Sequence, residues 1–194
     1  TQRSTLFPYT TLFRSRQVPQ TSEGFVVAAN HTSLLDTFIY PALLGESALF
    51  VGKSELRGVP LFGWLFGRLG NIFVRRGGGR EASEELIAQA RERGSGLSVF
   101  LHPEGTRSRD GELQPFKKGF VYLAIGTGKQ VLPIVSFGGE RLWPRGTRVP
   151  RPGTIRVSIG EPLPTAGWRP ETAERHSAEV HAACARLREA GFRQ

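Results

Sequence analysis

The sequence predicts an α/β fold in a single domain. Short apolar runs of strand length alternate along the chain with longer segments of helical periodicity, which is typical of a sheet layered with helices. The chain has 194 residues, enough for one domain with a substantial core and too short for two of ordinary size. Its balance of 39% hydrophobic and 22% charged residues predicts a folded protein rather than a disordered one.

Six apolar runs are expected to form the strands. The first is a buried run, and the last alternates apolar with other residues, as a strand with one exposed face does. In chain order they cover Phe25–Ala29, Ala48–Val51, Ile72–Val74, Leu97–Leu101, Val131–Val135 and Thr154–Ile159. A loop rich in proline, glycine and arginine, residues 141–153, precedes the last strand.

Helical patterns lie between these strands. The clearest covers residues 80–93, where Ala82, Leu86 and Ala90 recur at four-residue intervals, with glutamates toward the start and arginines near the end. Gly94 is expected to end this helix. Further helices are expected over residues 36–44, 119–126 and 171–190.

The chain is strongly basic, and this favours anionic partners. Its 26 lysines and arginines against 17 acids give a formal net charge of +9, which suits nucleic acid, phosphorylated metabolites or acidic lipid head groups. The single cysteine, Cys184, excludes an internal disulfide and a cysteine zinc cluster and indicates a reducing compartment. No stretch approaches the roughly 20 apolar residues that span a bilayer, so we expect any membrane contact to be peripheral.

The N-terminal segment differs in character from the rest. Residues 5–15, TLFPYTTLFRS, resemble the translation of a common short-read sequencing adapter, and the chain contains no Met. We therefore expect residues 1–15 to be an adapter-derived artefact and residues 16–194 to form the domain.

The first polar cluster that can carry chemistry covers residues 30–36, where a predicted buried strand gives way to a helix. Histidine is the usual general base near neutral pH, and a carboxylate on its other ring nitrogen fixes the tautomer and stabilises the imidazolium. His31 and Asp36 are five residues apart, too far for one helix face, so a turn must join them. The spacing alone favours a plainer alternative, in which Asp36 or Ser33 only caps the helix.

The second cluster, residues 102–109, also follows a predicted strand. A glycine flanked by an acid, a hydroxyl group and two arginines can present backbone N–H and guanidinium groups to a phosphate. A surface turn with Gly105 at positive φ is an equally good interpretation. In a third segment, residues 70–76, paired arginines emerge from a strand, and exposed arginines are usually only solvated.

Together and in this order, the segments resemble the motif blocks of the glycerolipid acyltransferase family, which contains bacterial 1-acylglycerol-3-phosphate acyltransferases. The matching positions are Asn30, His31 and Asp36, then Gly70, Ile72, Phe73 and Arg76, then Pro103–Ser108, then Val131–Ile134. The resemblance covers residues 24–164. One departure is His102, where the family usually has Phe, so the local packing differs.

The resemblance implies a mixed, largely parallel sheet flanked by helices. It also implies that the acyltransferase domain is truncated here at its N-terminus. It implies transfer of a fatty acyl chain from acyl-CoA or acyl carrier protein to the free hydroxyl of a lysophosphatidate-like acceptor, a step of phospholipid biosynthesis that yields phosphatidic acid. His31 then takes the hydroxyl proton and Asp36 orients His31, and no protein nucleophile, metal or cofactor is expected. The implied substrate-binding residues are Arg76, Glu104, Gly105, Thr106 and Arg107, with Lys53 as a further candidate.

Backbone N–H groups near Gly105 are expected to stabilise the oxyanion. The resemblance also implies a peripheral location on the cytoplasmic face of a membrane. Residues 59–69 suit either a helix in the membrane interface or acyl tunnel, or a buried core helix. This stretch holds three aromatic residues and has an arginine near each end: Phe62, Trp64, Phe66, Arg57 and Arg68.

Two other functions remain open. A basic nucleic-acid-binding module fits the net charge and the arginine-rich loop over residues 141–151, but this reading leaves the His-x4-Asp block unused and the chain shows no interleaving of aromatic and basic residues, so no nucleic acid is expected. An inactive lipid-binding relative is the other alternative, although both catalytic residues are present.

Overall fold

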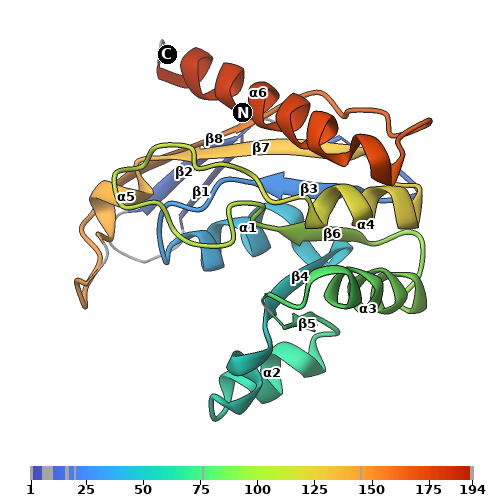
Figure 1. The fold of residues 1–194 in the computed structure, drawn as a ribbon. Helices are drawn as coiled ribbons and strands as arrows, with labels where there is room; N and C mark the ends of the chain where they lie inside the picture. Colours follow the sequence, from blue (N-terminus) through green and yellow to red (C-terminus); the bar gives the residue numbers. More distant parts are fainter. Residues whose placement is uncertain are drawn as a thin grey trace.

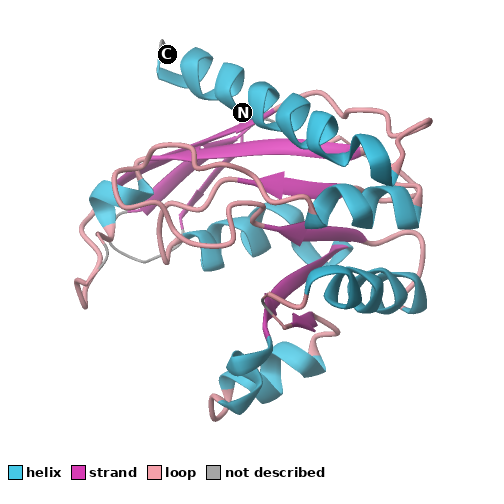
Figure 2. Cartoon of the chain, in the orientation of Figure 1, coloured by secondary structure: helices cyan, strands magenta, loops and turns pink. Residues whose placement is uncertain are grey.

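The computed structural model describes residues 2–5, 11–15, 18–19, 21–75, 77–144 and 146–192. Its eight-stranded sheet has the order β1-β2-β8-β7-β3-β6-β4-β5 (Figures 1 and 2). The strands are β1 Gln2–Thr5, β2 Thr11–Ser15, β3 Val26–Ala29, β4 Ala48–Lys53, β5 Ile72–Val74, β6 Ser98–Leu101, β7 Val131–Phe137 and β8 Gly153–Ile159. Most neighbours are parallel, whereas β7 and β8 and also β1 and β2 run antiparallel, which confirms the predicted mixed, largely parallel sheet.

Helices cover both faces of this sheet. The α-helices are α1 Asp36–Leu44, α2 Phe62–Arg68, α3 Gly79–Glu92, α4 Gly119–Thr127, α5 Gly139–Leu142 and α6 Ala173–Phe192. Three short 3₁₀ turns join them to the strands: η1 Gly45–Ser47, η2 Ser54–Gly58 and η3 Pro170–Thr172. In Figure 1, α3, α4 and α6 lie on the near face of the sheet, and α1 lies behind it.

The core follows from the two-residue periodicity of the strands. Along β3, Val26 and Ala28 pack into the cluster with α3, α4 and α6, whereas Val27 and Ala29 pack into the cluster with α1. All four side chains are fully buried, as expected for a central parallel strand covered on both faces.

The observed elements agree with the predicted ones except at residues 2–5 and 11–15, which form the unpredicted strands β1 and β2, and near residues 54–69 and 141–153. The predicted loop overlaps the end of α5 and the start of β8. The interpretation of residues 59–69 as a buried core helix is wrong, because most of its large apolar side chains are exposed. Within the part of the chain that the structure describes, no helix has both the length and the apolar character needed to cross a membrane.

The N-terminal strands lie at one edge of the sheet. The backbone of β2 pairs in parallel with β8, in the register Thr11 with Gly153, and β1 pairs with β2. The expectation that residues 1–15 lie outside the domain therefore stays a prediction, to be tested by deleting them.

Candidate active site

The two polar clusters meet beyond the carboxyl ends of three adjacent parallel strands. β3 pairs in parallel with β6 on one side and β7 on the other, so residues 30–36, which follow β3, lie beside residues 102–109, which follow β6. Ligand sites in open α/β sheets lie beyond this edge, which supports treating the two clusters as one site.

A hydrogen bond joins His31 and Asp36 across the turn between β3 and α1. His31 Nδ1 lies 2.8 Å from Asp36 Oδ2, which also accepts the backbone N–H groups of Thr32 at 2.8 Å and Ser33 at 3.0 Å. Asp36 is the first residue of α1 and is buried, and α1 begins without a side-chain cap. The predicted turn is confirmed, and the capping interpretation of Asp36 is wrong. The catalytic role of the pair stays a prediction.

The bond to Asp36 determines which nitrogen of His31 can act as a base. Since the carboxylate accepts a hydrogen bond from Nδ1–H, the neutral ring carries its proton on Nδ1 and leaves Nε2 free to take a proton. The His31 side chain is 18% exposed, so the ring is largely enclosed but reachable from solvent. This arrangement can remove a proton from a hydroxyl group that approaches Nε2.

Buried amide groups fix the end of β3 to the end of β7. Asn30 Nδ2 donates to the Ser136 carbonyl at 3.0 Å, and the Ser136 N–H donates to Asn30 Oδ1 at 2.8 Å. The Tyr40 hydroxyl donates to the Asn30 carbonyl at 3.4 Å, and burial raises the Tyr40 pKa well above its usual value. Because Asn30 directly precedes His31, this clamp restricts where His31 can lie.

His102 lies against His31, a contact that the sequence analysis did not predict. The two rings stack with centroids 3.9 Å apart and planes 10° apart, and His102 Nδ1 donates to the Ala29 carbonyl at 3.0 Å. Burial, and secondarily the nearby His31, lower the His102 pKa to about 3, so its ring is neutral at physiological pH. His102 directly follows β6 and His31 lies two residues after β3, and this placement at the ends of paired strands could have predicted their proximity.

Three potential metal ligands lie together here, but their geometry does not suit an ion. Ligand atoms of His31, Asp36 and His102 lie within 4.8 Å of one another. Asp36 Oδ2 already accepts three hydrogen bonds, and in-plane lone pairs of two stacked, nearly parallel rings do not converge on one point. The expectation of no metal stays a prediction.

The loop after β6 is held against His31 by its backbone. The Gly105 N–H donates to the His102 carbonyl at 3.0 Å, and the Ser108 N–H donates to the His31 carbonyl at 2.8 Å. Gly105 has φ +71°, as the turn interpretation requires. The Gly105 N–H is therefore occupied, and the expectation that backbone N–H groups near Gly105 stabilise an oxyanion stays a prediction for its neighbours. The backbone N–H groups of Thr106 and Arg107 have no acceptor among the described residues, so they are the candidates to stabilise the oxyanion.

Glu104 is buried behind this loop without a hydrogen-bond partner. Neither carboxylate oxygen of Glu104 has a hydrogen bond of normal geometry to a described residue. Burial raises the pKa of this group to about 8 and outweighs the backbone N–H groups of His31 and Gln114, which lower it. At neutral pH the side chain is therefore mostly a neutral carboxylic acid. In this state it can donate a hydrogen bond as well as accept one.

The cationic candidates differ in how they are placed. Arg107 is half-buried in the loop and makes no ion pair with a described acid, whereas Lys53 is exposed at the carboxyl end of β4. Arg76 lies outside the described residues. Lys117 was not predicted as a site residue, but its amino group would lie 3.0 Å from a Cβ placed on Gly105.

Cys184 takes no part in this site. Its side chain is fully buried on α6 beside Val135 and Phe137, and burial raises the thiol pKa to about 12. This inert, buried thiol belongs to the core.

Comparison with known proteins identifies the family. The model of the Acyltransferase family matches residues 11–136, so the chain belongs to this family. A 1-acyl-sn-glycerol-3-phosphate acyltransferase of Cocos nucifera is 32% identical over 159 residues, 81% of this chain and 51% of the relative. One of Pseudomonas aeruginosa is 35% identical over 146 residues, 75% of this chain and 56% of the relative.

A solved structure resembles the whole fold. The crystal structure of the 1-acyl-sn-glycerophosphate (LPA) acyltransferase PlsC from Thermotoga maritima superposes with a TM-score of 0.74 at 30% identity. The match covers 92% of this chain and 72% of that one. The chain spans about half the length of the curated relatives that it matches.

Proposed function

We propose that this protein transfers a fatty acyl chain from a thioester to the free hydroxyl of a lysophosphatidate, producing phosphatidic acid. The observation that carries the proposal is the His31–Asp36 pair, with Nδ1 2.8 Å from the carboxylate, at the carboxyl ends of β3 and β6 in a chain of the acyltransferase family. The names of its relatives support a lysophosphatidate acceptor.

The reaction follows from this geometry in one sequence of bond changes. His31 Nε2 takes the proton from the acceptor hydroxyl. The hydroxyl oxygen attacks the thioester carbonyl carbon at the same time and forms the ester C–O bond. The C–S bond then breaks, and the leaving thiolate takes the proton from the imidazolium. Asp36 stabilises the imidazolium between these steps, and the amides of Thr106 and Arg107 are candidate donors to the oxyanion.

We place the acceptor phosphate at the loop after β6. Arg107 and Arg76 offer guanidinium groups that bind phosphate with charge-assisted hydrogen bonds, and Lys53 and Lys117 add positive charge. Gly105 keeps this loop open, since a side chain there would meet Lys117. Thr106 is exposed on this loop and is the candidate to contact the glycerol, and Glu104, buried behind the loop, would reach the acceptor only from below it.

The donor is either acyl-CoA or acyl carrier protein, and we expect the enzyme to work peripherally on the cytoplasmic face of a membrane. Both substrates of the proposed reaction carry long acyl chains, which partition into bilayers. The basic net charge favours a surface of anionic lipids.

An acyl-transfer assay with a panel of acceptors tests the proposal. The purified chain is incubated with radiolabelled acyl-CoA, or acyl carrier protein, and with lysophosphatidate, lysophosphatidylcholine or glycerol 3-phosphate. We expect diacylated product from lysophosphatidate in preference to the other two. Equal acylation of lysophosphatidylcholine, whose phosphate is capped by choline, would contradict a pocket that selects a terminal phosphate. A lack of product from every acceptor would contradict the proposed activity.

A further inference from the structure

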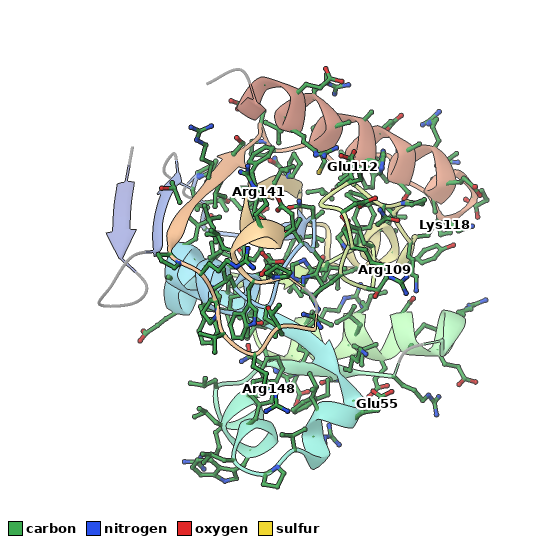
Figure 3. The ribbon with its side chains drawn as sticks, turned by 90° about the vertical axis from the view of Figure 1, so that its left-hand side faces the viewer. Glu55, Arg109, Glu112, Lys118, Arg141 and Arg148 are labelled. Carbon is green, nitrogen blue, oxygen red and sulfur yellow. The ribbon has the colours of Figure 1, made fainter. Side chains whose placement is uncertain are left out.

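The hairpin made of η2 and α2, residues 54–69, exposes an unusual set of apolar side chains. Leu61 is 75%, Trp64 64% and Leu69 66% exposed, and Val59 and Leu65 are also exposed. In the views of Figures 1 and 3, this α2 hairpin projects from the sheet at the end opposite α6. Exposed apolar side chains gathered on one short hairpin indicate an interaction site.

The α2 hairpin holds these side chains out by specific backbone contacts. The Gly63 N–H donates to the Val59 carbonyl at 2.8 Å, and a Cβ on Gly63 would lie 2.3 Å from the Arg57 carbonyl oxygen. Leu61, at the tip, has φ +63° and is the only non-glycine residue with positive φ within the described ranges. A strained leucine kept at an exposed tip indicates a functional constraint.

A basic pocket of about 420 Å³ opens beside these apolar residues. Arg57, Arg68 and Arg93 line it with Trp64 and Phe73, and no acidic residue is among its lining. The Arg57 guanidinium lies 5.1 Å from the Phe73 ring and the Arg68 guanidinium 5.8 Å from the Trp64 ring. None of the three arginines forms an ion pair with a described acid.

Arg93 is fixed within this pocket. Its Nε donates to the Gly70 carbonyl at 2.6 Å and its Nη1 to the Gln89 carbonyl at 2.9 Å, which uses two of five N–H donors. An anion that enters the pocket therefore meets three positive charges, one of them held in place by the backbone.

We propose that the α2 hairpin docks on an anionic lipid bilayer, with its apolar side chains in the interface and a lipid phosphate in the arginine pocket. The exposed apolar side chains lie next to the pocket that holds the three arginines, which pair with no described acid. The apolar side chains complement the acyl region of one leaflet, and the arginines complement its anionic head groups. The choice of a lipid surface rests on the proposed function, whose substrates carry acyl chains. The proposal adds the element that makes the contact.

Vesicle binding tests this docking without any need for turnover. The full chain and its variants are sedimented with vesicles of phosphatidylcholine alone or mixed with phosphatidylglycerol. Trp64→Ala and Leu61→Ser are each expected to weaken binding about tenfold. Arg57→Gln and Arg68→Gln are each expected to weaken binding about fivefold, and this effect should appear only on the anionic vesicles. Matched controls are Phe38→Ala, a 45% exposed aromatic residue on α1, and Arg186→Gln, an exposed arginine on α6.

Fluorescence gives a direct measure of insertion. Lipids brominated in their acyl chains should quench wild-type emission, and the quenching should fall in Trp64→Phe. Equal binding by hairpin variants and controls, with unchanged thermal midpoints, would overturn the proposal. A lipid-free dimer that dissociates in Leu61→Ser would also overturn it, because a second copy would then cover the surface. A failure of acyl transfer leaves these measurements intact.

His102 carries a second inference from a different observation. Its ring is enclosed by three aromatic neighbours: His31 stacks on it at 3.9 Å, and Phe100 and Tyr40 meet it edge-on at 4.9 and 5.6 Å. Its Nδ1–H is committed to the Ala29 carbonyl, so the ring cannot rotate without losing that bond.

We infer that His102 is a positioning residue for His31, rather than a second base. Its flat, fixed ring restricts His31 to the plane in which Nδ1 meets Asp36, and the face of a neutral aromatic ring attracts the imidazolium that forms during proton transfer. The role rests on the proposed function, in which His31 is the base. Phe keeps a flat ring at this position, whereas Ala removes it.

A pair of variants tests the positioning role. His102→Ala should lower kcat about tenfold with KM little changed, and His102→Phe should restore most of kcat. In nuclear magnetic resonance spectra, the His31 Nδ1–H signal should persist in the wild type and His102→Phe and disappear by exchange in His102→Ala. A folded His102→Ala protein with wild-type kcat and an intact signal would overturn the inference. The spectra decide the question even if the wild type transfers no acyl chain.

Discussion

At the scale of single residues, Glu104 combines deep burial with a lack of hydrogen-bond partners among the described residues. Its pKa is raised from 4.5 to about 8, so between these values the folded state binds more protons than the unfolded state. The corresponding stability is fully present below pH 4.5 and is lost as the pH rises through about 8. A neutral Glu104 also supplies a donor that an ionised acid lacks.

Replacing Glu104 by Gln should therefore flatten the dependence of stability on pH. We expect the thermal midpoint of the wild type to fall between pH 5 and pH 8 relative to that of Glu104→Gln, because Gln keeps the shape and does not ionise. Thermal unfolding across this range measures the difference. Parallel curves for the two proteins would show that Glu104 has an ordinary pKa.

Arg107 and Arg76 should act on acceptor binding more than on the chemical step. A guanidinium paired with phosphate stabilises the ground state and the transition state alike, so Arg107→Ala and Arg76→Ala should raise KM for lysophosphatidate more than they lower kcat. Steady-state kinetics measures both, with Arg186→Ala on α6 as the charge-matched control. If KM stayed at the wild-type value in both variants, the phosphate would bind elsewhere.

At the scale of elements, Asn30 links the ends of β3 and β7. Asn30→Ala would leave the N–H and carbonyl of buried Ser136 without their present side-chain partners, which costs about 2 kcal/mol in the free energy of unfolding. Urea unfolding measures this loss. A free energy within experimental error of the wild type would show that the clamp contributes nothing.

Local patterns predicted the elements but not how they are exposed. The apolar run before Asn30 and the four-residue periodicity of residues 80–93 correctly placed β3 and α3, because buried strands and amphipathic helices have a direct sequence signature. The α2 hairpin has no such signature. Its many apolar residues fit a buried core helix as well as an exposed interfacial helix. Which of the two forms depends on whether neighbouring elements cover it.

At the scale of the whole molecule, the site depends on strand order. The turn from His31 to Asp36 lies within one segment and could be predicted from the motif, whereas the stacking of His102 on His31 requires β6 to be the neighbour of β3. Strand order arises from contacts between distant parts of the chain. The pairing of Ser136 with Asn30 escaped prediction for the same reason.

Deleting residues 1–15 tests whether this segment belongs to the fold. We expect a chain that begins at Arg16 to match the full chain in thermal midpoint and turnover, because an adapter translation carries no selected packing pattern. Differential scanning calorimetry measures the midpoint. A loss of several degrees, equivalent to ~1 kcal/mol or more, would show that the pairing of β2 with β8 stabilises the domain.

The central claim is that His31, oriented by Asp36, removes the acceptor proton during acyl transfer. The most direct test is the kcat of His31→Ala for the acylation of lysophosphatidate, measured on protein with a wild-type thermal midpoint. The pair at 2.8 Å predicts that kcat falls by about 10² to 10⁴, the usual contribution of a general base. A folded His31→Ala protein that retained wild-type kcat would contradict the account.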